Sequence, residues 1–171
     1  MNEVAVKHLT NIDPVLSELN KISPKREWDI REPNFEGFVK IIIGQSLSNK
    51  AAETIFERVK KLYPNLLISE MLTVKIHNNK FYNCGISKSK TEYIKNLANH
   101  CVQNKFFFNE LTQKSDKEVI HELTKLKGIG IWSASIFCLF HLNRKNIFVI
   151  KDVSLKKAVE KLYFNDKSFS N

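Results

Sequence analysis

The sequence predicts an all-α fold, because apolar residues recur at helical spacing along most of the chain and capping residues bound these segments. The clearest example follows Pro33, where one apolar face is formed by Phe35, Phe38, Val39, Ile42 and Ile43. Only residues 147–150 have the character of a strand, and four residues without a partner run do not make a sheet.

Capping residues place the helices that follow. Ser48 is predicted to cap a helix that ends near Pro64. Gly85 is expected to stop a short helix, and Ser87 to cap the helix that runs to about Cys101. A capping box, Ser115 with Glu118 three residues later, predicts another helix start.

Two further helices are expected in the last third of the chain. One runs from about Gly130 to His141, with an apolar set of Trp132, Ile136, Phe137 and Phe140. The other starts near Asp152 and carries Leu155, Ala158, Val159 and Leu162.

Composition excludes several classes of protein. The 171 residues suit one domain or two interlocked lobes, and 43% apolar with 26% charged residues is typical of a globular chain. The longest apolar runs fall short of the roughly 20 residues that cross a bilayer, and the N-terminal residues do not resemble a signal peptide. We therefore expect no membrane partner and a cytoplasmic location, associated with the nucleoid if the source is bacterial.

The sequence indicates no metal site. Cys84, Cys101 and Cys138 share no short ligand spacing, and we expect free or buried thiols. The five histidines show no paired helical spacing, so none is assigned a role. We expect no cofactor.

The charge balance points towards a polyanionic partner. The formal net charge is +9 at pH 7, from 27 Lys and Arg against 18 Asp and Glu. Cations that neutralise phosphates release condensed counterions, which favours binding to nucleic acid. A lysine-rich solvated surface is equally common, so the net charge favours a nucleic-acid partner but does not by itself predict one.

The most informative segment is a glycine hairpin, defined as residues 126–130, between two predicted helices. Gly128 and Gly130 permit a tight turn and a close backbone approach. The N–H groups that open the following helix then face outward and can receive a phosphate, with Lys125 and Lys127 beside it. Leu126, Ile129 and Ile131 are expected to pin the hairpin to the core; a plain turn between two helices remains the alternative.

Asp152 is the second candidate residue. It lies in an apolar stretch at the start of the last predicted helix, so its local explanation is an N-cap carboxylate. Basic residues surround it, which would suit DNA phosphates beside a buried acid; they are Arg144, Lys145, Lys151, Lys156 and Lys157.

Three blocks in register resemble the helix-hairpin-helix (HhH-GPD) DNA glycosylases that use a catalytic aspartate. The first block, residues 35–52, contains Gln45. The second is a Gly-Ile-Ser-x-x-Lys segment from Gly85 to Lys90, and the third is the hairpin followed by residues 148–155. The match covers about residues 35–158.

The closest similarity is to the 3-methyladenine DNA glycosylase II branch. Bifunctional relatives carry a lysine at the position of Trp132, and tryptophan cannot serve as an amine nucleophile. The resemblance implies a monofunctional enzyme, a DNA glycosylase without lyase activity, that releases alkylated purines from double-stranded DNA in base excision repair. No four-cysteine cluster follows Asp152, so no iron–sulfur cofactor is expected.

The resemblance also implies an organisation and a set of site residues. A central helical lobe is expected over 35–110, the helix-hairpin-helix over 115–142, and a second lobe from 1–34 with 143–171, with the active-site cleft between the lobes. Asp152 is the implied catalytic residue, Trp132 and Phe140 line the base pocket, and the protein is expected to act as a monomer. The implied DNA contacts are Gln45, Ser46, Leu47, Lys127, Gly128, Ile129, Gly130, Ser133 and Arg144.

Some positions depart from the family pattern. Ser46 stands where a large residue usually wedges into the vacated base stack, which leaves Leu47 as the candidate wedge. Only 19 residues follow Asp152, so we expect a shortened C-terminal part of the second lobe. Two alternatives stay open: a non-catalytic DNA-binding module, and a glycosylase for uracil, mismatched or oxidised bases.

Overall fold

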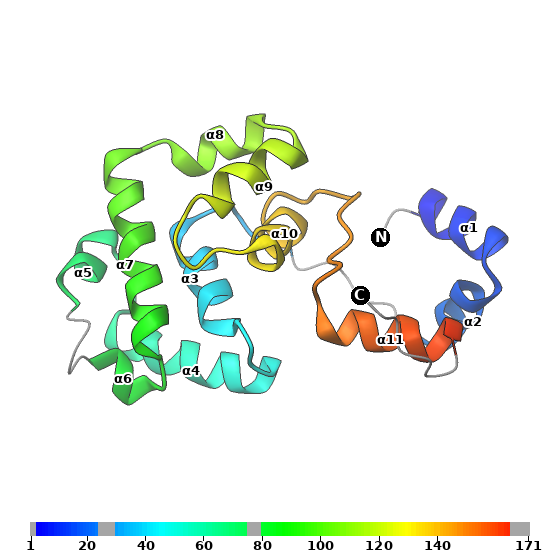
Figure 1. The fold of residues 1–171 in the computed structure, drawn as a ribbon, viewed down its shortest axis with the longest axis horizontal. Coiled ribbons are helices and arrows are strands. Elements are labelled where there is room, and N and C mark those ends of the chain that lie inside the picture. The colour runs from blue at the N-terminus through cyan, green and yellow to red at the C-terminus, as the bar shows by residue number, and fades with distance from the viewer. Residues whose placement is uncertain (1–2, 24–29, 75–79, 165–171) are drawn as a thin grey trace. The chain divides into compact units, whose positions relative to one another are not determined.

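The prediction of an all-α chain is confirmed. A computed structural model describes residues 3–23, 30–74 and 80–164, and the helices in these ranges are joined by turns and loops, with no strand among them (Figure 1). The chain divides into two compact units, a smaller one from residues 1–29 with 149–171 and a larger one from residues 30–148.

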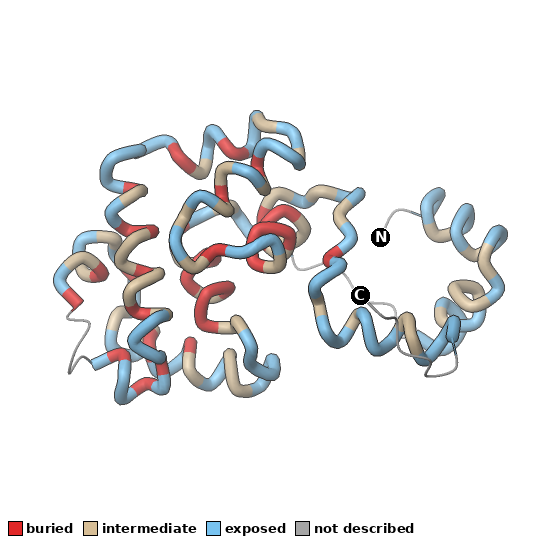
Figure 2. Tube along the Cα trace, in the orientation of Figure 1, coloured by how far each residue is buried: buried red, intermediate tan, exposed pale blue. Residues whose placement is uncertain are grey.

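The larger unit holds eight helices among its described residues. They are α3 (Phe35–Gly44), α4 (Asn49–Leu62), α5 (Ile68–Thr73), α6 (Lys80–Cys84), α7 (Lys88–Gln103), α8 (Phe107–Gln113), α9 (Asp116–Thr124) and α10 (Ile131–Phe140). Helix α3 packs against α4, α7 and α10, and α9 packs against α10. Figure 2 shows the buried residues gathered on these helices, which makes α3 and α10 the centre of the unit.

The core of this unit is aliphatic and aromatic. The rings of Phe38 and Phe137, both fully buried, lie 4.8 Å apart and join α3 to α10. Ile94 and Leu97 bring α7 to the same core. Each such side chain stabilises the fold by roughly 1.5–3 kcal/mol on burial, which holds the segments on either side of the hairpin in one rigid unit.

Local capping explains why these helices begin where they do. Ser48, Ser87 and Ser115 each accept a hydrogen bond from the backbone N–H three residues later, as predicted. The capping box at Ser115 is confirmed by the 2.8 Å hydrogen bond from its N–H to Glu118. Gly85 ends α6 with φ +97°, a left-handed conformation that favours glycine.

Four helices were not predicted, namely α1 (Glu3–Ile12), α2 (Pro14–Ile22), α5 and α8. A signal for α2 was present: Asp13 precedes Pro14, and its Oδ1 accepts hydrogen bonds from Val15 and Leu16. The N-cap residues of α5 and α8 are Leu67 and Phe106, whose side chains make no capping hydrogen bond, and both helices are short, so their sequences carry little local signal.

The smaller unit contains α1, α2 and α11 (Val153–Phe164), and α11 begins where the sequence predicted. None of the three helices has a fully buried residue. Tyr163 Oη donates a 2.7 Å hydrogen bond to Asp13 and so ties α11 to α2. Hydrogen bonds from Leu16 N–H and from Tyr163 lower the pKa of Asp13.

Two expectations about burial were wrong. Ile131 is 46% exposed and does not pin the hairpin to the core, because it occupies the outward face of the first turn of α10. Of the apolar set predicted for α10, only Phe137 is fully buried, whereas Trp132, Ile136 and Phe140 are half-buried. In the described part of the chain, no helix combines the length and apolarity needed to span a membrane.

Candidate functional site

The glycine hairpin joins α9 to α10. Gly128 has φ +83°, and a Cβ atom built on it would lie 2.1 Å from the ring of Tyr93 on α7. Glycine is therefore required here twice, by the backbone conformation and by the close approach of the ring. Ile129 is buried, so the hairpin is anchored through this residue and through the contact with Tyr93.

Gly130 differs from Gly128 in both respects. Its φ of −94° and ψ of 177° are open to any residue, and a Cβ built on it would meet no atom within 4 Å. Gly130 is the N-cap of α10, where no side chain caps the first turn. The positive end of the α10 dipole therefore faces open space, an arrangement that binds phosphate through backbone N–H groups.

Gln45 links α3 to this hairpin. Its Nε2 donates hydrogen bonds of 2.9 Å to the carbonyl oxygen of Gly128 and 2.9 Å to Oγ of Ser133. Ser133 is buried in the first turn of α10, so Gln45 contacts both sides of the hairpin. The structure thus brings together three of the predicted DNA-contact residues from segments far apart in the sequence.

Lys90 contacts the backbone of Gln45, and the sequence analysis did not assign it a role. Its Nζ donates to the carbonyl oxygens of Ile43 and Gln45, each at 2.7 Å. These carbonyls end α3, where a cation also complements the negative end of the helix dipole. Burial lowers the pKa of Lys90. The Gly-Ile-Ser-x-x-Lys segment contained the only sequence signal for this residue.

Ser46 and Leu47 form an exposed loop directly after Gln45. Ser46 has φ +58°, and Leu47 is 40% exposed. A leucine side chain on the exposed loop between α3 and α4 is suited to enter a base stack, as expected of the wedge. Its role as the wedge stays a prediction.

The predicted cationic contacts have partners within the larger unit. Lys127 pairs with Glu92 at 2.6 Å, which raises its pKa, and Lys125 pairs with Glu122 at 2.9 Å. Both pairs lie at the surface and cost little to open, so either lysine can exchange its carboxylate for a phosphate.

Arg144 is placed differently from the other predicted contacts. Its guanidinium donates to the carbonyl oxygens of Thr112 and Lys114, and its Nε lies 3.4 Å from Asp116. These groups precede or begin α9, whereas the hairpin follows the other end of that helix, about 12 Å away. The structure therefore gives Arg144 a role in holding α8 and α9, and its DNA contact stays a prediction.

Trp132 and Phe140 lie on one stripe of α10. Together with Ile136 they are spaced four residues apart, which places them on the same side of the helix. All three are half-buried, so the stripe leaves apolar and aromatic surface incompletely covered. Another aromatic residue, Tyr82, is 67% exposed on α6, and Trp28 lies outside the described residues.

Asp152 caps α11 in the smaller unit. Its Oδ1 accepts a 2.9 Å hydrogen bond from the N–H of Leu155, and its carbonyl oxygen accepts from Lys156. The side chain is half-buried. The cap explanation is thus confirmed, and the cap holds the carboxylate at the N-terminal end of α11.

His141, which received no role at the sequence level, is buried at the end of α10. Its Nδ1 lies 2.9 Å from the carbonyl oxygen of Glu32, and its ring stacks on Phe137. A Cβ on Gly37 would lie 2.1 Å from this ring, which explains glycine in the first turn of α3. Among the residues that the structure describes, no group of three His, Cys, Asp or Glu side chains could hold a metal ion.

Comparison with known proteins shows which family this chain resembles. The model of the HhH-GPD superfamily of base excision DNA repair proteins matches residues 39–170. A DNA-3-methyladenine glycosylase 1 from Schizosaccharomyces pombe is 27% identical over 162 residues, which cover 91% of this chain and 71% of that protein.

Two solved structures share the fold. A 3-methyladenine DNA glycosylase from S. pombe in complex with abasic DNA matches with a TM-score of 0.82 and 26% identity, over 92% of this chain and 79% of that one. A DNA-3-methyladenine glycosidase from Bacillus halodurans matches with a TM-score of 0.75 and 31% identity, over 95% and 75%.

Proposed function

This chain belongs to the HhH-GPD superfamily of base excision DNA repair proteins, and from that premise we propose that it is a monofunctional glycosylase. It hydrolyses the N-glycosidic bond of alkylated purines, of the 3-methyladenine and 7-methylguanine type, in double-stranded DNA. The structural observation that carries the proposal is the open N-terminus of α10 at Gly130. Hydrogen bonds from Gln45 connect it to the wedge loop, defined as Ser46 and Leu47. The relatives named for 3-methyladenine support the substrate class.

Duplex DNA binds through backbone groups in this proposal. The N–H groups at the start of α10 receive a phosphate of the strand that carries the damaged base, and Lys127 adds a cation beside them. Leu47 fills the space that the flipped nucleotide leaves. Because flipping costs a few kcal/mol and alkylated bases stack and pair poorly, damaged nucleotides are extruded selectively. The protein acts as a monomer.

Asp152 supplies the chemistry. A purine methylated at N3 or N7 carries positive charge and departs as a neutral base, so no strong general acid is needed at the base. The sugar instead develops oxocarbenium character, which an ionised carboxylate stabilises while it orients or deprotonates the attacking water. The helix cap holds the Asp152 carboxylate rigidly for this task.

The base pocket selects for charge. A cationic base over the ring of Trp132 gains roughly 0.5–2 kcal/mol of cation–π attraction, and Phe140 extends the same aromatic stripe. A tryptophan at this position forms no Schiff base with the sugar, so strand cleavage is not expected.

A panel of duplexes with one lesion each tests this function. We expect abasic sites, revealed by alkali, from methylated purines and not from duplexes that carry uracil, a mismatched pyrimidine or 8-oxoguanine. Cleavage of the strand without alkali would contradict the monofunctional assignment. If no duplex released a base although all were bound, the chain would be a non-catalytic DNA-binding module instead.

A further inference from the structure

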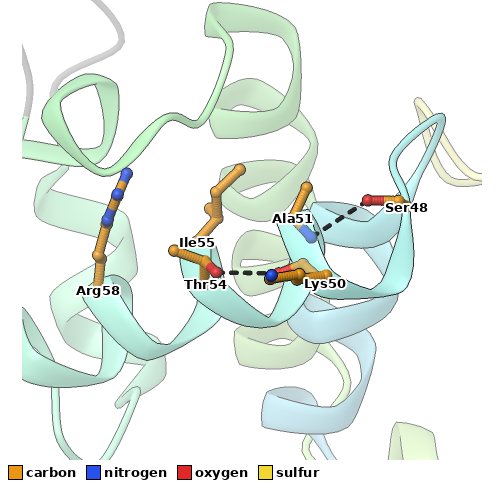
Figure 3. Close-up of a pocket in the computed structure, with 6 residues that line it drawn as sticks. All are labelled: Ser48, Lys50, Ala51, Thr54, Ile55 and Arg58. Carbon is orange, nitrogen blue, oxygen red and sulfur yellow. Dashed lines mark hydrogen bonds between the residues drawn. The ribbon is translucent and has the colours of Figure 1, made fainter.

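One face of α4 carries a basic hollow that the proposed function has not used. The hollow, of about 420 Å³, is lined by Ser48, Lys50, Ala51, Thr54, Ile55 and Arg58 (Figure 3). Ser48, Ala51, Ile55 and Arg58 recur three or four residues apart, so they share one side of the helix. Ile55 contacts the position of Gly85, and this places the turn between α6 and α7 beside the hollow.

The lining contains two cations and no carboxylate. Lys50 and Arg58 have no hydrogen-bond or ion-pair partner for their side chains among the residues that the structure describes. Neighbouring lysines behave differently: Lys40 pairs with Glu53 at 2.7 Å and Lys60 with Glu36 at 2.8 Å. Both cations of the hollow are therefore available to an external anion.

The hollow starts where the wedge loop ends. Ser48 caps α4 and follows Leu47 directly, and Gln45 on the other side of Leu47 contacts the hairpin. From the loop, α4 continues along α3 and α6. The exposed leucine thus separates two anion-binding features, the open N-terminus of α10 and the basic hollow of α4.

We infer that the basic hollow binds backbone phosphates of the DNA strand opposite the damaged one. This inference rests on the proposed function, in which the hairpin holds the damaged strand and Leu47 enters the duplex. The strand on the far side of the inserted leucine is then the complementary one. Lys50 and Arg58 neutralise its phosphates, and Ser48 and Thr54 add hydroxyl groups at the rim.

The dimensions of the hollow suit this ligand. Lys50 and Arg58 lie about 12 Å apart along the axis of α4, at 1.5 Å per residue. Successive phosphates of one strand advance about 3.4 Å along the duplex, so the two cations can engage phosphates a few steps apart on the same strand.

The salt dependence of DNA binding tests the inference. The probe is a duplex with a tetrahydrofuran abasic analogue, and the variants are K50A/R58A and the control K105A/K117A, which removes two exposed lysines elsewhere. Loss of two phosphate contacts reduces the slope of log K against log salt by about 1.8. A rise from 50 to 200 mM salt then weakens wild-type binding about 12-fold more than binding of K50A/R58A. The control is expected to keep the wild-type slope.

A second arm identifies the strand. Neutral methylphosphonates in the complementary strand, opposite the analogue, should weaken DNA binding by the wild type and leave DNA binding by K50A/R58A unchanged. Both proteins should bind a single-stranded probe with the same affinity. An unchanged slope for K50A/R58A, or an equal effect of the methylphosphonates on both proteins, would overturn the inference.

Failure of the proposed function gives a different result. If the wild type released no methylated purine and still showed the slope difference and the strand dependence, the basic hollow would stand and the catalytic proposal would fall. If methylated purines were released and the slope were unchanged, the reverse would hold.

Discussion

At the residue scale, the two glycines of the hairpin have different reasons to be glycine. Gly128 is dictated by the fold, through its positive φ and the ring of Tyr93, whereas nothing within the described structure requires Gly130. We propose that Gly130 is glycine because a phosphate of the bound DNA approaches its backbone closely. The sequence could show that both glycines permit a turn, and the structure separates their roles.

Substitution of each glycine by alanine tests this difference. G128A is expected to lower the free energy of unfolding by at least about 1–3 kcal/mol, because the left-handed conformation is strained and the ring must move. G130A is expected to cost less than about 1 kcal/mol, through the weaker N-cap. Urea denaturation measures both values.

DNA affinity should show the opposite order. For the folded fraction of each protein, G130A weakens binding to an abasic-analogue duplex more than G128A does. Equal affinity of G130A and the wild type would indicate that no phosphate approaches this residue.

At the element scale, local caps were predictable and long-range contacts were not. Each N-cap serine bonds to a backbone N–H only three residues later, so the helix starts could be predicted from the local sequence at Ser48, Ser87 and Ser115. The bond from Lys90 to the carbonyl oxygen of Gln45 joins residues 45 positions apart, and no periodicity reveals such a pair. The family resemblance implied a DNA contact for Gln45, but its hydrogen bonds to Gly128 and Ser133 are visible only in the structure.

Lys90 should act on the wedge loop and not only on stability. In K90M the carbonyl oxygens that end α3 lose a charged donor, and we expect a loss of about 1–2 kcal/mol in the free energy of unfolding. Because Gln45 then moves more freely, DNA affinity and base release should fall as well.

Lys95 provides the matched control on the same helix. It also donates to a backbone carbonyl oxygen, that of Val74, at 2.7 Å. K95M is expected to lose comparable stability and to keep the DNA affinity of the wild type. A parallel loss of affinity in both variants would mean that Lys90 acts through stability alone.

At the scale of the whole molecule, the buried thiols make stability depend on alkaline pH. Burial raises the pKa of Cys101 to about 12 and of Cys138 to about 11, from an ordinary value of 9.0. Above pH 9 the unfolded chain releases these protons while the folded chain keeps them, so stability present below pH 9 is lost as the pH rises.

The variant C101A/C138A is expected to lessen this alkaline loss. Urea denaturation at pH 8, 9 and 10, under reducing conditions, should show a smaller fall in the free energy of unfolding than in the wild type. A fall of the same size in both proteins would assign the alkaline instability to other groups, such as Tyr63, whose pKa is raised by burial.

For the whole molecule, the sequence predicted the fold class and the family correctly. It did not predict two of the three helices of the smaller unit. Helices α1 and α2 contain no buried residue and were not predicted, although Asp13 and Pro14 mark the start of α2. Asp152 illustrates the limit of local reasoning. Its capping bond accounts fully for an aspartate at that position, and only the match over residues 39–170 adds a reason to assign it chemistry.

The most direct test of the proposed chemistry is the rate of base release by D152N. Asparagine caps a helix as well as aspartate does, so this variant removes the charge and keeps the cap. D13N is the matched control, since Asp13 caps α2 in the same unit. The measurement is release of 3-methyladenine from methylated duplex, with affinity for an abasic-analogue duplex measured alongside. We expect D152N to bind DNA like the wild type and to release base at least about 100-fold more slowly, and D13N to behave as the wild type. Base release by D152N at the wild-type rate would contradict the account.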